Sequence, residues 1–322
     1  MDASQAGTSQ PRERQRQMTA QRPFLRELPD GRHISAVSFG CSSLWAQVRF
    51  DKGVALRLLD VAMEGGINYF ATGPSYGNGE AERRLGEWLR SQATNVLVST
   101  SVGSAFDDSG RAFRSFLAPD MEASLTASLR RLGRERVDVL YLHGPSASDL
   151  NDEVFRYLER EKERGRVVWT GVNSIDPQVI DASVDAPIDA VMLQFNIDDR
   201  SNAQFLPRLS SSRKIVVSGP AMARAIYSLS TFVPSNRCRA WYLLRAVKSD
   251  PAFLFRGSML ARRMHHFTDE DSASVALRYS VAQPYLHTSV FGTVNCGHMR
   301  ANIAAARREF DDEELRKLRS FH

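Results

Sequence analysis

The chain is poor in cysteine and has no long apolar run. Its three cysteines among 322 residues, Cys41, Cys238 and Cys296, are scattered along the sequence. This spacing offers neither a disulfide framework nor a Cys-x-x-Cys metal site, so we expect no metal and a reducing, cytoplasmic location. No stretch of about 18 apolar residues occurs, so no membrane-spanning helix and no membrane partner are expected. Residues 1–23 also lack the apolar centre of a secretory signal.

Lysine is scarce as well, with only five among the 42 basic residues and a formal net charge of +5. The basic residues alternate with acids along predicted helices, as in residues 80–84 and 159–164. Such alternation is typical of solvated helix faces with pairs four residues apart. We therefore expect a small-molecule substrate and no nucleic-acid partner. The oligomeric state stays open.

Short apolar, β-branched runs alternate with amphipathic stretches over most of the chain. The runs predict eight strands, near residues 37–39, 67–70, 96–100, 137–142, 167–171, 190–195, 215–218 and 288–291. Helices are predicted over 52–65, 80–92, 120–132, 152–164, 175–183, 269–282 and 296–309. Eight β–α units over about 280 residues favour an α/β fold of the (β/α)8 TIM-barrel type. An open doubly wound sheet is the alternative, but no Gly-x-Gly-x-x-Gly motif follows the first strand.

Outside the repeating β–α units, the sequence predicts an N-terminal tail, a hairpin and one long insertion. Residues 1–23 are polar and are interpreted as a mobile tail. The Pro-Asp-Gly turn within residues 26–33 predicts an N-terminal hairpin. No linker divides residues 24–322, which we interpret as one barrel domain. Residues 222–268 are long for one unit and are expected to hold an extra helix and a substrate loop.

Residues 66–77, GINYFATGPSYG, carry a specific motif. The motif resembles the second-strand signature of the aldo-keto reductases, G-I-N-x-F-D-T-A-x-x-Y-G. Further segments match this family in order: residues 98–103, 129–143, 165–172, 193–196 and 292–302. The resemblance covers about residues 25 to 310 and implies the (β/α)8 barrel of that family.

The resemblance also implies a catalytic group of Asp, Tyr, Lys and His that reduces a carbonyl with NADPH. Tyr76 and His143 occupy the matching tyrosine and histidine positions, whereas Ala71 stands at the aspartate position and Ser101 at the lysine position. The two changes are consistent with each other, because either charge without the other would be buried and unpaired. Without the lysine, Tyr76 is expected to be a neutral proton donor at pH 7 and a poor base. The alternative is that Tyr76 is only a packed aromatic side chain.

The positions that hold the cofactor in this family are altered too. By resemblance they are Asn173, Ser174, Gln194, Ser218, Arg224, Gly292, Thr293, His298 and Asn302. The pair Asn173–Ser174 is in reverse order, and Arg224 replaces a glycine. Arg224 either binds a phosphate or fills the cofactor slot, so binding of NADP(H) is left open. The Gly-Thr before the last predicted helix suits a phosphate at a helix N-terminus, or is an ordinary helix start.

Three aromatic residues near predicted strand ends, Trp45, Phe106 and Trp169, are expected to line the substrate pocket. The missing Asp and Lys favour non-redox acid–base chemistry with His143 as acid or base. Dehydration, isomerisation, cyclisation or elimination of a small carbonyl metabolite in a biosynthetic pathway would fit. Two alternatives stay open: an NADPH-dependent reductase of a ketone or aldehyde with Tyr76 as proton donor, and a non-catalytic binding scaffold.

Overall fold

The computed structural model describes most of the chain. Its described residues are 23–91, 96–106, 109, 111–221, 272–311 and 313–314, with single positions at 240, 243, 244, 247, 248, 251, 255, 259, 262 and 264. The predicted tail therefore lies almost wholly outside the described residues. The same holds for most of residues 222–268, including Arg224.

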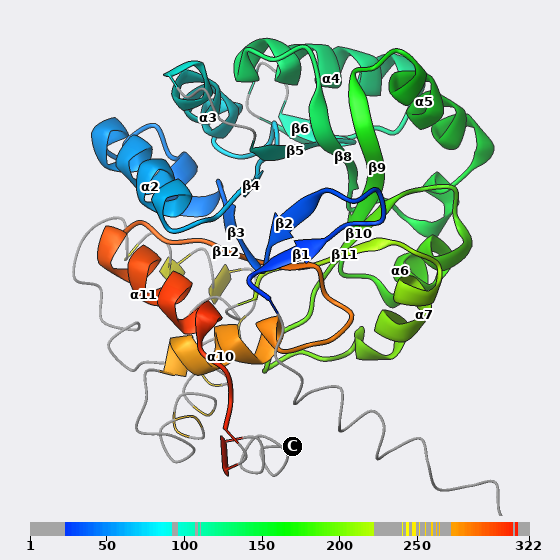
Figure 1. Cartoon of the computed structure of the whole chain (residues 1–322). Helices are drawn as coiled ribbons and strands as arrows, with labels where there is room; N and C mark the ends of the chain where they lie inside the picture. Colours follow the sequence, from blue (N-terminus) through cyan, green and yellow to red (C-terminus); the bar gives the residue numbers. More distant parts are fainter. Residues whose placement is uncertain are drawn as a thin grey trace, which may run out of the picture.

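A closed barrel of eight parallel strands forms the centre of the fold (Figure 1). The strands are β3 (Val37–Gly40), β4 (Tyr69–Ala71), β5 (Leu97–Val102), β8 (Val137–His143), β9 (Val167–Ser174), β10 (Ala190–Leu193), β11 (Ile215–Ser218) and β12 (Thr288–Phe291). The pairing of the last strand, β12, with the first, β3, closes the ring, with Ser289 opposite Val37. The predicted (β/α)8 barrel is confirmed, and the open sheet is excluded.

Helices surround the barrel and follow the strands in the chain. They are α2 (Lys52–Glu64), α3 (Glu80–Ser91), α4 (Ala118–Leu132), α5 (Asp152–Glu163), α6 (Pro177–Asp185), α7 (Leu206–Ser211), α10 (Ser272–Val281) and α11 (Cys296–Arg307). Helix α6 begins two residues later than predicted, because the Asp176 carboxylate caps it by accepting from Gln178 N and Pro177 occupies its first turn. The short helix α7 has no counterpart in the sequence prediction.

The helix ends follow from local sequence. Asn151 caps α5 by accepting hydrogen bonds from the backbone N–H groups of Glu153 and Val154. Helix α4 ends at Gly133, whose φ of +64° is a left-handed conformation that glycine adopts without strain. Such signals are readable in the sequence, which is why most helices agree with their predicted ranges.

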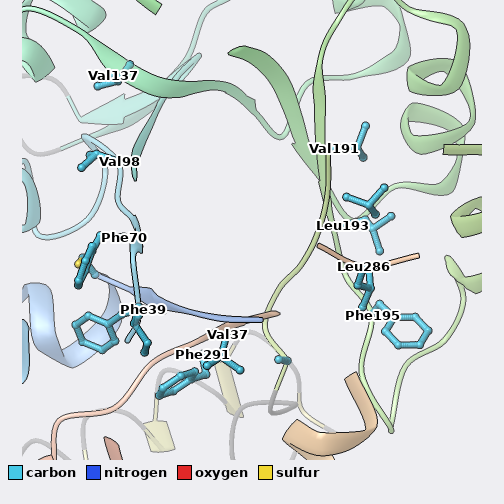
Figure 2. Packing of buried hydrophobic residues seen from close by; sticks show 14 of the residues in the cluster. Val37, Phe39, Phe70, Val98, Val137, Val191, Leu193, Phe195, Leu286 and Phe291 are labelled. Carbon is cyan, nitrogen blue, oxygen red and sulfur yellow. The ribbon is translucent and has the colours of Figure 1, made fainter. Parts of the chain in front are cut away.

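The core has two layers, because side chains alternate between the two faces of each strand. The outer layer packs between the strands and the helices, and Figure 2 shows Val98, Val137 and Val191 in it. The inner layer fills the barrel with Tyr69, Leu97, Val139, Tyr141, Trp169, Ala190, Met192, Ile215 and Val217, among others. Each large side chain buried in this way contributes about 1.5–3 kcal/mol to stability.

A hairpin of β1 (Leu25–Glu27) and β2 (His33–Ser35) lies across the end of the barrel where the strands begin (Figure 1). Its Leu28 and Ile34 belong to the inner layer of the core. The buried Arg26 donates to the carbonyl oxygens of Leu286 at 2.8 Å and Val281 at 2.7 Å. The predicted N-terminal hairpin is confirmed, and it closes the floor of the barrel.

A second hairpin, β6 (Ser104–Phe106) with β7 (Ala112–Arg114), was not predicted from the sequence. It is antiparallel and places Ser104 opposite Arg114. Because it follows β5 directly, it projects from the end of the barrel at which the strands finish.

Among the described residues, no helix is long and apolar enough to cross a membrane.

Replacement of Arg26 should weaken the floor of the barrel. Arg26→Met keeps much of the apolar stem but leaves two buried carbonyl groups without their donor, so we expect a loss of about 2 kcal/mol or more in the free energy of unfolding. Urea unfolding followed by circular dichroism measures this loss. Arg208→Met is the matched control, because Arg208 pairs with Asp181 at the half-exposed surface. The control should change stability by about 0.5 kcal/mol or less. Equal effects of the two variants would contradict the assigned role of Arg26.

Candidate active site

The candidate site lies where the barrel strands end, because alternate residues of each strand point into the barrel. On β8, Val139 and Tyr141 face inward, and the same alternation brings His143 to the rim. On β9, Trp169 and Gly171 face inward, and Asn173 follows at the rim, opposite His143. All strands are parallel, so their last inward residues collect at one end.

A cavity of about 60 Å³ opens among these residues. Tyr76, Ala71, Ser101 and Asn173 line it, as the sequence predicts. Its other wall residues were not predicted: Gly40, Ser42, Thr72, Ser99, Tyr141, Met192 and Val290. The two-residue alternation from Ser101 to Ser99 and from His143 to Tyr141 is the sequence signal that could have found part of this set.

Tyr76 reaches the cavity from the loop between β4 and α3. The loop passes close to the 3-10 turn Ser43–Ala46, and a Cβ at Gly77 would lie 1.9 Å from Ala46 O. Glycine is therefore required at position 77, next to Tyr76. The φ of Gly77, +62°, is a second reason, because glycine adopts this left-handed conformation without strain. The Tyr76 ring meets the His143 ring edge to face, with centroids 6.0 Å apart. Tyr76 and His143 are thus brought together, as predicted.

Burial shifts the pKa values of Tyr76 and His143 in opposite directions. It raises the pKa of the Tyr76 hydroxyl above its usual value of 10.0. Burial and then the positive charge of Arg114 lower the pKa of His143 from 6.5. The Nδ1 atom of His143 is buried and has no hydrogen-bond partner within the described part of the chain. Both groups are therefore neutral at pH 7, with Tyr76 protonated.

Hydroxyl groups stand where the family resemblance implies an ion pair. A Cβ on Gly73 would lie 2.8 Å from Ser101 Oγ and 3.4 Å from Tyr76 Cε2, which places the serine near the tyrosine ring. Thr72 Oγ1 is buried and has no hydrogen-bond partner among the described residues. Deeper in the barrel, Tyr69 donates to Tyr141 across 3.3 Å. No lysine or carboxylate lines the cavity, so Tyr76 lacks a neighbouring charge there that would lower its pKa.

The predicted nicotinamide residues divide into accessible and buried groups. Asn173 lines the cavity. Gln194 donates from Nε2 to Asp199 Oδ2 at 2.7 Å, which orients the amide and leaves its oxygen as an acceptor. Ser174 is buried and accepts from Asp176 N. Ser218 was predicted to contact the cofactor, but it is fully buried and its hydroxyl bonds Ser289 at 3.0 Å, so that prediction is corrected.

The segment between β12 and α11 presents backbone donors. Gly292 and His298 are exposed, Thr293 is half-buried, and Asn302 is buried in α11. Asn295 caps the helix by accepting from His298 N at 3.0 Å. The first N–H groups of a helix have no intrahelical partner, so this end suits an anion. Arg224, the other predicted phosphate residue, lies outside the described residues.

The aromatic residues predicted to wall the pocket do not line the cavity. Trp45 is 1% exposed, meets Phe39 edge to face and donates from Nε1 to Ala55 O, so it belongs to the outer core. Trp169 lies four residues before Asn173, about 13 Å lower along the strand. Arg32 of the floor covers its ring at 3.8 Å. Both predictions are corrected, because these side chains pack elsewhere. The side chain of Phe106 lies outside the described residues.

The sequence model of the Aldo/keto reductase family matches residues 36–210, more than half of the chain. The chain belongs to the aldo/keto reductase family. It is 29% identical to an uncharacterized oxidoreductase of Bacillus subtilis, with 89% of this chain and 92% of the relative covered. It is 25% identical to L-galactose dehydrogenase of Arabidopsis thaliana, with 85% of each covered.

Comparison with solved structures agrees with this family membership. The holo form of an aldo-keto reductase from Bacillus halodurans superposes with a TM-score of 0.75 at 25% identity, covering 93% of this chain and 96% of the other. The geometry fits the nicotinamide cofactor that the family implies. The Asn173 amide at the cavity and the oriented Gln194 amide suit a carboxamide, and the start of α11 suits a phosphate. The described residues contain no group of three or more metal-ligating side chains.

Restoring the ion pair should show strong coupling between positions 71 and 101. Ala71→Asp alone and Ser101→Lys alone each bury an unpaired charge, and we expect each to cost about 3 kcal/mol or more of stability. The double variant should lose at least about 1 kcal/mol less than the two single losses together. Urea unfolding of the four proteins measures the coupling. Ser101→Met is the control for side-chain volume without charge, and strictly additive losses would contradict the shared cavity.

Proposed function

We propose that the protein is an NADPH-dependent oxidoreductase that reduces a ketone or aldehyde group of a small molecule, with Tyr76 as the proton donor. The observation that carries this proposal is the meeting of Tyr76 and His143 beside the cavity. The family membership and the oxidoreductases among its relatives support it. The cytoplasm is the proposed location, since Cys41 and Cys296 are free thiols.

Each side chain of the site has a definable task. NADPH, when bound, supplies the hydride. The Tyr76 hydroxyl donates a proton to the carbonyl oxygen as negative charge develops there. The neutral His143 ring faces Tyr76 and orients the same oxygen by a hydrogen bond. Asn173 and Gln194 would hold the carboxamide of the cofactor, and Asp199 fixes the orientation of Gln194.

The uncharged side chains at positions 71 and 101 set the protonation state of the site. Reduction consumes a proton from the tyrosine, and burial keeps Tyr76 protonated. No charge at Ala71 or Ser101 stabilises a tyrosinate. At neutral pH the resting site therefore carries the proton that carbonyl reduction consumes.

The residues taken alone favour non-redox acid–base chemistry, and the absence of a charge at positions 71 and 101 is the observation behind that hypothesis. The relatives are oxidoreductases, which gives the reductase the better support. The two functions differ in one requirement, because only the reductase needs NADPH for turnover. A binding scaffold would need neither cofactor turnover nor Tyr76.

Removal of the Tyr76 hydroxyl should abolish most of the reductase activity. We expect micromolar, saturable NADPH binding by fluorescence, and oxidation of NADPH at 340 nm on addition of an aldehyde or ketone. Tyr76→Phe should lower kcat by about 10²–10⁴-fold, the usual contribution of general acid catalysis, and leave cofactor affinity within about threefold.

Tyr157→Phe is the matched control. Tyr157 lies on α5, its hydroxyl is buried without a partner, and it does not line the cavity. The control should leave kcat unchanged. Absence of NADPH binding at millimolar concentration would overturn the reductase proposal. Turnover without NADPH that is lost in His143→Ala would establish the non-redox alternative.

The dependence of kcat/KM on pH should reflect the shifted pKa values of His143 and Tyr76. The lowered pKa of His143 keeps it neutral above about pH 7, and the raised pKa of Tyr76 keeps it protonated to at least pH 10. We expect kcat/KM for reduction to be constant between these two pH limits. It should fall only above the upper limit, where Tyr76 begins to ionise. Rates at saturating NADPH across this range test the prediction. A fall with a midpoint below pH 8 would show that Tyr76 ionises readily, contrary to its surroundings.

A further inference from the structure

Arg114 is a cation next to the candidate site that the proposed reaction does not use. It is the last residue of β7 and pairs with Ser104 at the base of the hairpin that follows β5. Its Nη1 donates to the carbonyl oxygen of Gly144 at 2.8 Å. Gly144 follows His143 directly, so the guanidinium is anchored at the rim beside the histidine.

The close approach of the guanidinium depends on glycine. A Cβ at Gly144 would lie 3.0 Å from Arg114 Nη2, and the φ of Gly144 is +64°. A larger residue there would both strain the backbone and push the arginine away. The rim thus holds one positive charge close to His143, whose pKa is lowered first by burial and then by this charge.

The charge of Arg114 has no carboxylate partner within the described residues. Two acids of the described part of the chain that are near in sequence are engaged elsewhere: Asp120 accepts from Ser115 Oγ at 2.5 Å, and Asp149 accepts from Ser146 N and Oγ. The hydrogen bond to Gly144 uses one of the five N–H donors of the guanidinium. The side chain is exposed, so the remaining donors are open to a solute.

We propose that Arg114 binds a carboxylate of the substrate, so that the preferred substrates are carbonyl compounds that carry an acidic group. This inference rests on the reductase function proposed above. A guanidinium binds a carboxylate through two parallel hydrogen bonds, and its single positive charge equals the single negative charge of a carboxylate. With the carboxylate at Arg114, the carbonyl of the same molecule lies toward His143 and Tyr76.

The test compares two probes of similar shape, 4-carboxybenzaldehyde and methyl 4-formylbenzoate, which differ in charge. At saturating NADPH we expect kcat/KM to be at least tenfold higher for the acid. Arg114→Gln retains a donor for Gly144 O but removes the charge. It should lower kcat/KM for the acid at least tenfold, mainly through KM, and change the ester less than twofold. Arg114→Lys should recover part of the preference, and added salt should raise KM for the acid alone.

A purely structural role of Arg114 predicts equal losses for acid and ester, and that result would overturn the inference. Titration calorimetry with benzoate and methyl benzoate gives a readout that needs no turnover. Binding of benzoate that is lost in Arg114→Gln would support the anion site even if NADPH is never oxidised, in which case only the reductase proposal fails. Reduction of both aldehydes without preference, or no binding of benzoate, would overturn the anion site.

Discussion

Closure of the parallel sheet between its last strand, β12, and its first, β3, is the constraint on which the rest of the structure depends. In a closed parallel barrel every strand ends at the same rim, and alternate side chains of every strand share one interior. Ser101, His143 and Asn173 come from three strands, yet the ring brings them to one end. The site is therefore a consequence of barrel geometry combined with a two-residue alternation.

A hairpin lies at each end of the barrel, and the two hairpins differ in the side chains that they contribute. At the floor, β1 and β2 add Leu28 and Ile34 to the inner core, and Arg26 ties the hairpin to the chain near α10 and β12. At the rim, β6 and β7 add a charged residue, Arg114, beside His143. The apolar hairpin stabilises the fold, whereas the charged one modifies the surroundings of the site. This division matches the general separation of stability and activity between the two ends of such barrels.

The cavity near Tyr76 has no charged side chain among the described residues that line it. Ala71 and Ser101 are both uncharged, and the neighbouring wall is made of hydroxyl groups from Thr72, Ser99 and Tyr141. A buried carboxylate without its lysine would carry a large desolvation cost, so the two positions are physically coupled. The result is a neutral site in which Tyr76 remains a donor and His143 remains uncharged.

Local sequence patterns were sufficient for the strands, most helices and the N-terminal hairpin, because alternation, capping residues and turn residues act over a few positions. The family resemblance, rather than local pattern, pointed to Tyr76, His143, Ala71, Ser101 and Asn173, which lie close together at the rim. Trp45, Trp169 and Ser218 were misplaced, because nearness to a strand end in the sequence does not reveal which layer a side chain enters. Trp169 lies near the beginning of β9 and packs against Arg32, and the Ser218 hydroxyl bonds Ser289. The β6–β7 hairpin and the place of Arg114 depend on contacts between distant segments. Such contacts exist only once the ring has closed.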